Sequence, residues 1–259
     1  MTRYPIWALL GALILIQICY PLTGGSTRAA LTVSTVLIGY IISTGHALVT
    51  RGPRAALALI GTATLGGFAV EAVGVATGFP FGTYDYSGQL GPKLLGVPLI
   101  IPLAWTWMAW PAWLAALRLA RATAARVAIA AFGLAAWDLF LDPQMVAEGY
   151  WRWPDPTPAL PGVPGVPIGN YLGWLGFALL LMAALAAAGG RATKSPDAAD
   201  APIIALWFWT YASSVLAHAV FLGLPASAAW GGALMGIAVL PLAMRMRRPR
   251  APAVRGGRR

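Results

Sequence analysis

The sequence is poor in charged residues. Asp, Glu, Lys and Arg make up only 10% of its 259 residues, whereas a soluble domain carries about 25%. Apolar residues account for 59%, and runs long enough to cross a bilayer recur along the whole length. No Gly/Ser linker or low-complexity segment interrupts them. We therefore predict one transmembrane domain, 1–244, followed by a basic tail, 245–259.

Cysteine and histidine are scarce as well. Cys19 is the single cysteine, which excludes an intramolecular disulfide and a cysteine metal cluster. The two histidines, His46 and His218, lie far apart in the sequence, which argues against a zinc site. No glycine-rich nucleotide loop follows a strand pattern. We expect neither a metal nor another cofactor.

Glycines, prolines and charges divide the apolar stretches into separate runs. This pattern predicts an all-α, polytopic membrane helix bundle of about eight transmembrane helices. Only residues 223–225 separate the last two runs. The predicted spans lie near 5–21, 29–49, 55–78, 97–117, 123–143, 168–188, 202–223 and 225–244.

The basic residues fall mostly on one side of the predicted bundle. With eight spans, fifteen of the 18 Lys and Arg lie on the side of the termini, and only Arg28, Lys93 and Arg152 lie on the other. Positive loops stay in the cytoplasm, so both termini are predicted to be cytoplasmic, with the protein in the plasma membrane. The tail is expected to contact anionic lipid headgroups. It has no aromatic interleaving and no folded module beside it, so nucleic acid is not an expected partner.

The acidic residues have the opposite distribution. Asp197 and Asp200 fall on the predicted cytoplasmic side, and His218 lies near the outward end of its span. The other six acids lie in the outward halves of two spans or in the loops that follow: Glu71, Asp85, Asp138, Asp142, Glu148 and Asp155.

Two parts of the chain resemble one another. Glu71 precedes "GTYDY" (82–86) by eleven residues, and Asp138 precedes "GYWRW" (149–153) by eleven. "GVPLIIPLAW" from Gly96 and "GVPIGNYLGW" from Gly165 also match, each ending in a tryptophan. We interpret this as a parallel internal repeat of helix, aromatic loop and helix. It makes Glu71 and Asp138 equivalent, so they are predicted to face each other across a pseudo-axis.

Carboxyl groups inside predicted membrane spans can have two roles. They can hold helices together through hydrogen bonds or ion pairs, or they can take part in the function of the protein. A charged carboxylate at a helix centre costs about 3 kcal/mol, less near the interface. Few basic partners lie at this level, so the protonated form is favoured, and a protonated carboxyl is a proton donor. Tyr and Trp also anchor helices at membrane interfaces, but those in the repeat stand beside the acids, where aromatic faces stabilise cations. The catalytic candidates are Glu71, Asp138 and Asp142, although Asp142 before Pro143 also marks a helix end. The substrate-binding candidates are Tyr84, Asp85, Tyr86, Trp105, Trp151, Trp153, Asn170, Trp174 and His218.

Two other classes of membrane protein fit less well. "DLFLD" (138–142) matches the aspartate spacing of membrane prenyltransferases, but no second aspartate-rich cluster accompanies it, and it points outwards. A transporter is compatible with repeats and intramembrane acids, yet these acids lie towards one face and not at the centre.

The chain resembles the carotenoid-biosynthesis integral membrane family, which includes hydratases of γ-carotene-type and bacterioruberin-type precursors. The resemblance is carried by "EAVGVATGFPFGTYDY" (71–86), "LGVPLIIPLAW" (95–105), "WDLFLDPQMVAEGYWRW" (137–153) and "GVPIGNYLGW" (165–174). It covers roughly residues 60–225. It implies a carotenoid substrate held among membrane lipids, and other enzymes of the pathway are candidate partners.

The resemblance implies cofactor-independent addition of water to the terminal isopropylidene double bond of an acyclic end group. In that reaction one carboxyl protonates the alkene and a partner carboxylate deprotonates the attacking water. We expect Glu71 and Asp138 to form this pair, supported by Asp142 and His218. The end group is expected to enter between spans three to six, under the loops 79–96 and 149–167. An end-group cyclase, a non-catalytic membrane scaffold and a transporter of lipophilic substrates remain alternatives.

Overall fold

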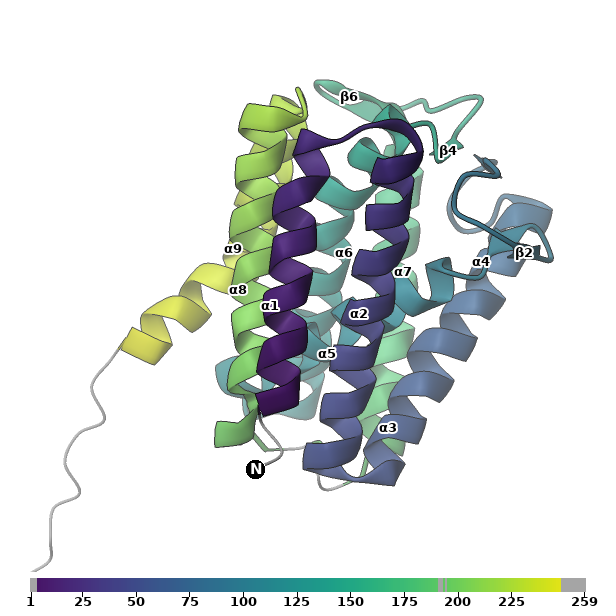
Figure 1. The fold of residues 1–259 in the computed structure, drawn as a ribbon. Coiled ribbons are helices and arrows are strands. Elements are labelled where there is room, and N and C mark those ends of the chain that lie inside the picture. The colour runs from purple at the N-terminus through teal and green to yellow at the C-terminus, as the bar shows by residue number, and fades with distance from the viewer. Residues whose placement is uncertain (1–3, 191–192, 194, 248–259) are drawn as a thin grey trace, which may run out of the picture.

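The computed structural model describes residues 4–190, 193 and 195–247, which form a bundle of long helices (Figure 1). The helices alternate in direction along the bundle, with loops and short strands gathered at one end. The α-helices are α1 (Tyr4–Cys19), α2 (Gly25–Arg51), α3 (Pro53–Leu59), α4 (Gly66–Thr77), α5 (Ile101–Leu119), α6 (Thr123–Ala147), α7 (Ile168–Ala188), α8 (Ala201–Leu216) and α9 (Pro225–Arg247). Shorter turns extend several of them: η1 (Tyr20–Leu22), η2 (Ile60–Leu65), η4 (Ala198–Asp200) and η5 (Ala217–Phe221).

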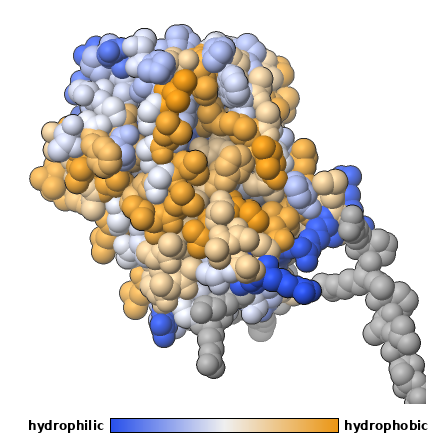
Figure 2. Space-filling view, turned by 180° about the vertical axis from the view of Figure 1, so that it is seen from behind, coloured by the Kyte–Doolittle hydropathy of each residue, from blue (hydrophilic) through white to orange (hydrophobic). Residues whose placement is uncertain are grey.

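The predicted spans agree with these helices. Among the described residues, seven helices are long and apolar enough to cross a membrane. One of them joins α3, η2 and α4 into a single span over Pro53–Thr77, in which η2 is a π-helical turn. The prediction of an all-α, polytopic membrane bundle is confirmed. Figure 2 shows the same character on one face, where hydrophobic residues cover the middle and hydrophilic ones gather towards both ends.

The remaining predicted span, 97–117, differs from the other seven. Its helix, α5, begins only at Ile101, after the short strand β3 (Val97–Pro98), and it is not among the seven apolar spans. Its tryptophans lower its hydropathy, yet 16 of its 19 residues are buried. The reason is its position, because α5 packs against α2, α4, α6, α8 and α9. It is the central helix of the bundle.

Close packing around α5 and α6 depends on glycine. A Cβ on Gly39 of α2 would lie 2.3 Å from the Trp107 ring of α5. A Cβ on Gly231 of α9 would lie 2.6 Å from the Phe140 ring of α6. Small residues at such contacts let helices approach closely and gain van der Waals contact, which drives helix association in lipid.

Two loops rich in Pro and Gly cover one end of the bundle (Figure 1). Each contains a hairpin, β2 (Lys93–Leu94) with β3 in the first, and β5 (Ala159–Leu160) with β6 (Val163–Pro167) in the second. The two loops are joined to each other by β1 (Asp85–Tyr86), which pairs antiparallel with β4 (Trp151–Arg152). The N-terminal end of α1 lies at the opposite end of the bundle. Which end faces the cytoplasm stays a prediction.

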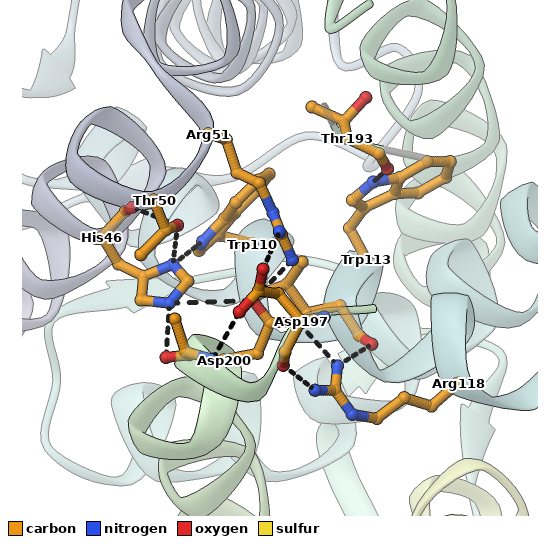
Figure 3. Close-up of polar contacts among 11 residues, drawn as sticks. His46, Thr50, Arg51, Trp110, Trp113, Arg118, Thr193, Asp197 and Asp200 are labelled. Atoms are coloured by element: carbon orange, nitrogen blue, oxygen red, sulfur yellow. Dashed lines mark hydrogen bonds and ion pairs between the residues drawn. The ribbon is translucent and has the colours of Figure 1, made fainter. Parts of the chain in front are cut away.

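Figure 3 shows a buried ion-pair cluster that ties helices together. It lies where α2 ends and α8 begins, at the end of the bundle opposite these loops (Figure 1). Asp200, whose side chain is completely buried, bonds to Arg51 at 2.6 Å and to Arg118 at 2.8 Å. His46 lies beside this cluster: Trp110 donates its indole N–H to Nδ1 at 3.0 Å, and Nε2 lies 3.1 Å from the carbonyl of Ala199. The cluster links the ends of α2, α5 and α8.

Replacing Asp200 by Asn is expected to destabilise the protein strongly. Removing one partner of a buried ion pair leaves the other charge uncompensated and costs about 3–5 kcal/mol of unfolding free energy. Circular dichroism melting in detergent measures this loss as a lower midpoint. Asp155→Asn, in an exposed loop at the other end, serves as the control and should leave the midpoint unchanged. Equal midpoints for both variants would show that the cluster does not stabilise the fold.

Candidate functional site

A small buried cavity of about 50 Å³ lies beneath the two loops, between α2, α4, α5, α6 and α7. Its wall is mostly apolar and aromatic, and two of the predicted catalytic acids reach it. The lining residues are Thr32, Val36, Glu71, Phe81, Tyr84, Tyr86, Leu90, Ile100, Ile101, Ala104, Trp105, Leu141, Asp142, Met145, Trp151, Trp153, Asn170 and Trp174.

Glu71 lies on α4 and is 3% exposed. Three side chains donate hydrogen bonds to its carboxyl group: Tyr84 Oη to Oε2 at 2.6 Å, Tyr86 Oη to Oε2 at 2.8 Å, and Trp105 Nε1 to Oε1 at 2.9 Å. The chain can return over Glu71 because α4 ends at Gly78, whose φ of +77° turns the backbone sharply. Three convergent donors fix the carboxyl group in one orientation and suit it to carry negative charge.

Tyr84 and Tyr86 remain neutral donors in this site. Burial raises the pKa of the Tyr84 hydroxyl, and the neighbouring Glu71 carboxylate raises it further. The pKa of Tyr86 lies well above its ordinary value for the same two reasons. Both hydroxyls therefore keep their protons at physiological pH and can hold Glu71 in place.

Asp138 and Asp142 lie one helical turn apart on α6 and share Asn170 of α7. Asn170 donates from Nδ2 to Asp138 Oδ2 at 2.9 Å and also to Asp142 Oδ2. Trp151 donates to the other oxygen of Asp142 at 3.1 Å. Asp142 lines the cavity, whereas Asp138 is completely buried behind it, and its Oδ1 has no hydrogen-bond partner among the described residues.

The site holds three buried carboxyl groups without a cation. Within the described ranges, no Lys, Arg or His nitrogen lies within 4 Å of Glu71, Asp138 or Asp142; every ion pair there is made by other acids. Two neighbouring carboxylates in a low-dielectric site repel each other strongly, and such pairs commonly share one proton. The arrangement can therefore present a protonated acid and a carboxylate to the same cavity. In that same part of the chain, no group of three potential metal ligands gathers.

The aromatic residues of the two predicted repeats contact one another. Tyr86 lies 5.5 Å from Trp151 and Tyr84 lies 5.6 Å from Trp153, measured between ring centroids. Trp105 stacks on Trp174 at 3.8 Å. These contacts are the ones that a pseudo-two-fold axis between two copies produces. The duplication itself stays a prediction that they support.

The glycine at which the hairpin turns is not the one that the sequence match paired with Gly96. The sequence alignment placed Gly96 opposite Gly165, but the two hairpins turn at Gly96 (φ +82°) and at Gly162 (φ +77°). The second copy contains Gly-Val-Pro twice in succession, at 162–164 and 165–167. Only the first occupies the turn, because Gly162 has the positive φ there.

The remaining candidates occupy different places. Asp142, and not Asp138, lines the cavity with Glu71. The pairing of Glu71 with Asp138 as catalytic groups stays a prediction. Asp85 is exposed on β1, opposite Arg152. His218 lies in η5, with its ring nitrogens 2.8 Å and 3.0 Å from two backbone carbonyls, and lines a neighbouring cavity.

Sequence reasoning missed the contribution of α2 to the cavity wall. Thr32 and Val36 line it beside Glu71 and Asp142. Neither residue type stands out in an apolar helix, and α2 lies outside the predicted repeat. The only usable signal was the cluster of small and polar residues along 32–36, which is common in membrane helices.

Comparisons with known proteins agree with this site. The profile of the carotenoid biosynthesis protein family matches residues 6–244. A bisanhydrobacterioruberin hydratase from Haloarcula japonica is 39% identical over 127 residues, which cover 47% of this chain and 41% of that protein. No solved structure matches the chain. Because the family profile spans nearly all of the membrane bundle, including both loops and all three buried acids, this integral, multi-pass membrane protein belongs to the carotenoid biosynthesis protein family.

Proposed function

We propose that the protein is a hydratase that adds water to the terminal isopropylidene double bond of an acyclic carotenoid end group. The observation that carries this proposal is the cavity itself, in which Glu71 and Asp142 face the same space among aromatic rings. The name of the Haloarcula japonica relative supports the same reaction class.

The first step is protonation of the alkene. Asp138 and Asp142 share one proton, and Asp142 delivers it because Asp142 is the member of the pair that lines the cavity. Asn170 and Trp151 orient the carboxyl group of Asp142. Transfer of this proton to the CH carbon of the isopropylidene double bond breaks the π bond and leaves a tertiary carbocation on the carbon that bears the two methyl groups. The aromatic wall, including Trp153 and Trp174, stabilises the positive charge through its π faces.

The second step is attack by water. Glu71, fixed as a carboxylate by its three donors, accepts a hydrogen bond from the water and orients it. The water oxygen bonds to the cation, and Glu71 takes the proton that is released, which gives a tertiary alcohol. A proton then returns from Glu71 to Asp142, so the cycle consumes one water and needs no cofactor. By the usual figure of 10–15 Å³ of probe-occupied volume per water, a cavity of about 50 Å³ accommodates a few water molecules.

Pigment analysis tests the reaction. Cells that make an acyclic carotenoid and this protein are expected to accumulate a product heavier by one water for each modified end group. Mass spectrometry of the extracted pigment measures this gain. A cyclised product of unchanged mass would show that the protein is a cyclase and not a hydratase. Unchanged pigment would favour a scaffold or a transporter. A plasma-membrane location and contacts with other pathway enzymes belong to the same proposal.

A further inference from the structure

Two further cavities lie between the candidate site and the lipid-facing surface. A chamber of about 130 Å³ lies behind the acids and contains His218 in its wall. It shares part of its lining with the acid cavity: Thr32, Val36, Ala104, Leu141 and Met145. The two spaces are therefore neighbours that share one wall of side chains.

The second is a groove of about 360 Å³ between α1 with η1 and α8 with η5. Gln17, Pro21, Ser213 and Ala217 line both this groove and the chamber. Figure 1 shows α1 beside α8 on the face towards the viewer. Groove, chamber and acid cavity thus form a row from the surface of the bundle to Asp142 and Glu71.

The outer part of this row is apolar. Ile18, Leu22, Leu216 and Phe221 line the groove and are 48%, 71%, 56% and 53% exposed. They belong to membrane-spanning segments, so they face lipid acyl chains. Beside them, Trp209 donates a hydrogen bond of 2.6 Å to Gln17 and ties α8 to α1 at the mouth of the groove.

The inner part contains donors without partners. The indole N–H of Trp107 and the hydroxyl of Thr210 have no hydrogen-bond partner in the described structure, although both residues line the chamber and are only 3% and 2% exposed. A buried donor left unpaired costs about 1–3 kcal/mol. A ligand that brings an oxygen atom into the chamber would recover this energy.

We propose that this row of cavities is the binding channel of the polyene. The proposal rests on the proposed function, because it takes the ligand to be a carotenoid. The acid cavity, at about 50 Å³, is far too small for a whole carotenoid, which is about as long as the roughly 30 Å hydrocarbon core is thick. The rest of the chain passes through the chamber and leaves between α1 and α8 into the lipid. This replaces the entrance expected between spans three to six.

An oxygen atom occupies the chamber beside Trp107 and Thr210. It belongs either to a water molecule that feeds the hydration or to a hydroxyl group carried by the polyene. Thr210→Val removes the hydroxyl at nearly constant volume and separates the two sources. Weaker binding of a hydroxylated polyene alone indicates the substrate hydroxyl. Slower hydration of hydroxylated and plain polyenes alike indicates water. If Thr210→Val changes neither polyene binding nor the hydration rate, no oxygen atom is bound at Trp107 and Thr210.

Cysteine protection tests the channel independently of catalysis. In a Cys19→Ser background, Ser213→Cys places the single thiol on the shared wall of groove and chamber, and Ile237→Cys places it on the exposed face of α9 as the control. An acyclic polyene in detergent micelles is expected to slow alkylation by N-ethylmaleimide several-fold at position 213 and not at 237. Equal effects at both positions would overturn the proposal.

A second measurement is needed if the thiol at position 213 does not react with N-ethylmaleimide even without polyene. Ser213→Trp fills the passage, so it should lower the polyene that co-purifies with the protein several-fold, measured by visible absorbance, whereas Ile237→Trp should not. Normal co-purification with Ser213→Trp would contradict the channel. Hydrated pigment from wild-type cells together with an unprotected thiol at position 213 refutes the channel alone. Protection at position 213 without any hydrated pigment refutes the proposed function alone.

Discussion

Glu71→Gln is expected to lower the yield of hydrated product by about 10²- to 10⁴-fold, the usual contribution of a positioned general base. The glutamine keeps the length and shape of the side chain, and its amide can still meet Trp105 and the tyrosine hydroxyls, which accept as well as donate. What it loses is the ability to take a proton from water. The hydrated fraction of the pigment, normalised to the amount of protein in the membrane, measures the effect.

Glu148→Gln is the matched control for this variant. Glu148 lies near the same end of the bundle, but it bonds to Arg28 and does not line the cavity. It should retain the hydrated fraction of the wild type. Glu71→Gln with wild-type product would rule out Glu71 as the base. A loss of folded protein in Glu71→Gln, seen as a lowered melting midpoint, would assign the group to structure.

Asp142→Asn is expected to cause the second large loss, again about 10²- to 10⁴-fold in product, because it removes the acid that protonates the alkene. The amide keeps the hydrogen bond to Asn170 or Trp151 on one atom and offers no acidic proton on the other. The initial rate of product formation in membranes supplied with polyene gives the magnitude. Polyene binding should persist, since the channel walls are unchanged.

Asp138→Asn distinguishes the roles of the two aspartates. Asp138 does not line the cavity and acts through Asn170 and Asp142. Asp138→Asn should therefore lower the rate of product formation less than Asp142→Asn does. Because the pair shares a proton, the substitution should also change the pH dependence of the rate, which a purely structural role would leave alone. A larger loss for Asp138→Asn than for Asp142→Asn would favour the predicted pairing of Asp138 with Glu71.

The local patterns of the sequence predicted the bundle well. The length of an apolar run fixes whether it can span a bilayer, and this property needs no knowledge of neighbours. The same pattern predicted a helix at 97–117, where the structure has α5, but it could not show that this helix lies buried at the centre of the bundle. Glu71 and Asp142 line the cavity together with all six Tyr and Trp candidates. The acids were conspicuous because carboxyl groups are rare in apolar helices, and the aromatic residues because they stand beside the acids in the repeated pattern.

The sequence by itself determined the class of protein and the approximate positions of its long helices. These follow from hydrophobicity and from residue spacing along one chain. Only the tertiary structure decided that Asp142 lines the same cavity as Glu71, that His218 lines a separate chamber, and that α1, α2 and α8 line the cavities beside the acids. The rotation of each helix about its axis decides these points. That rotation is set by packing between helices, such as Gly39 against Trp107 and Asn170 against the two aspartates, which no single segment encodes.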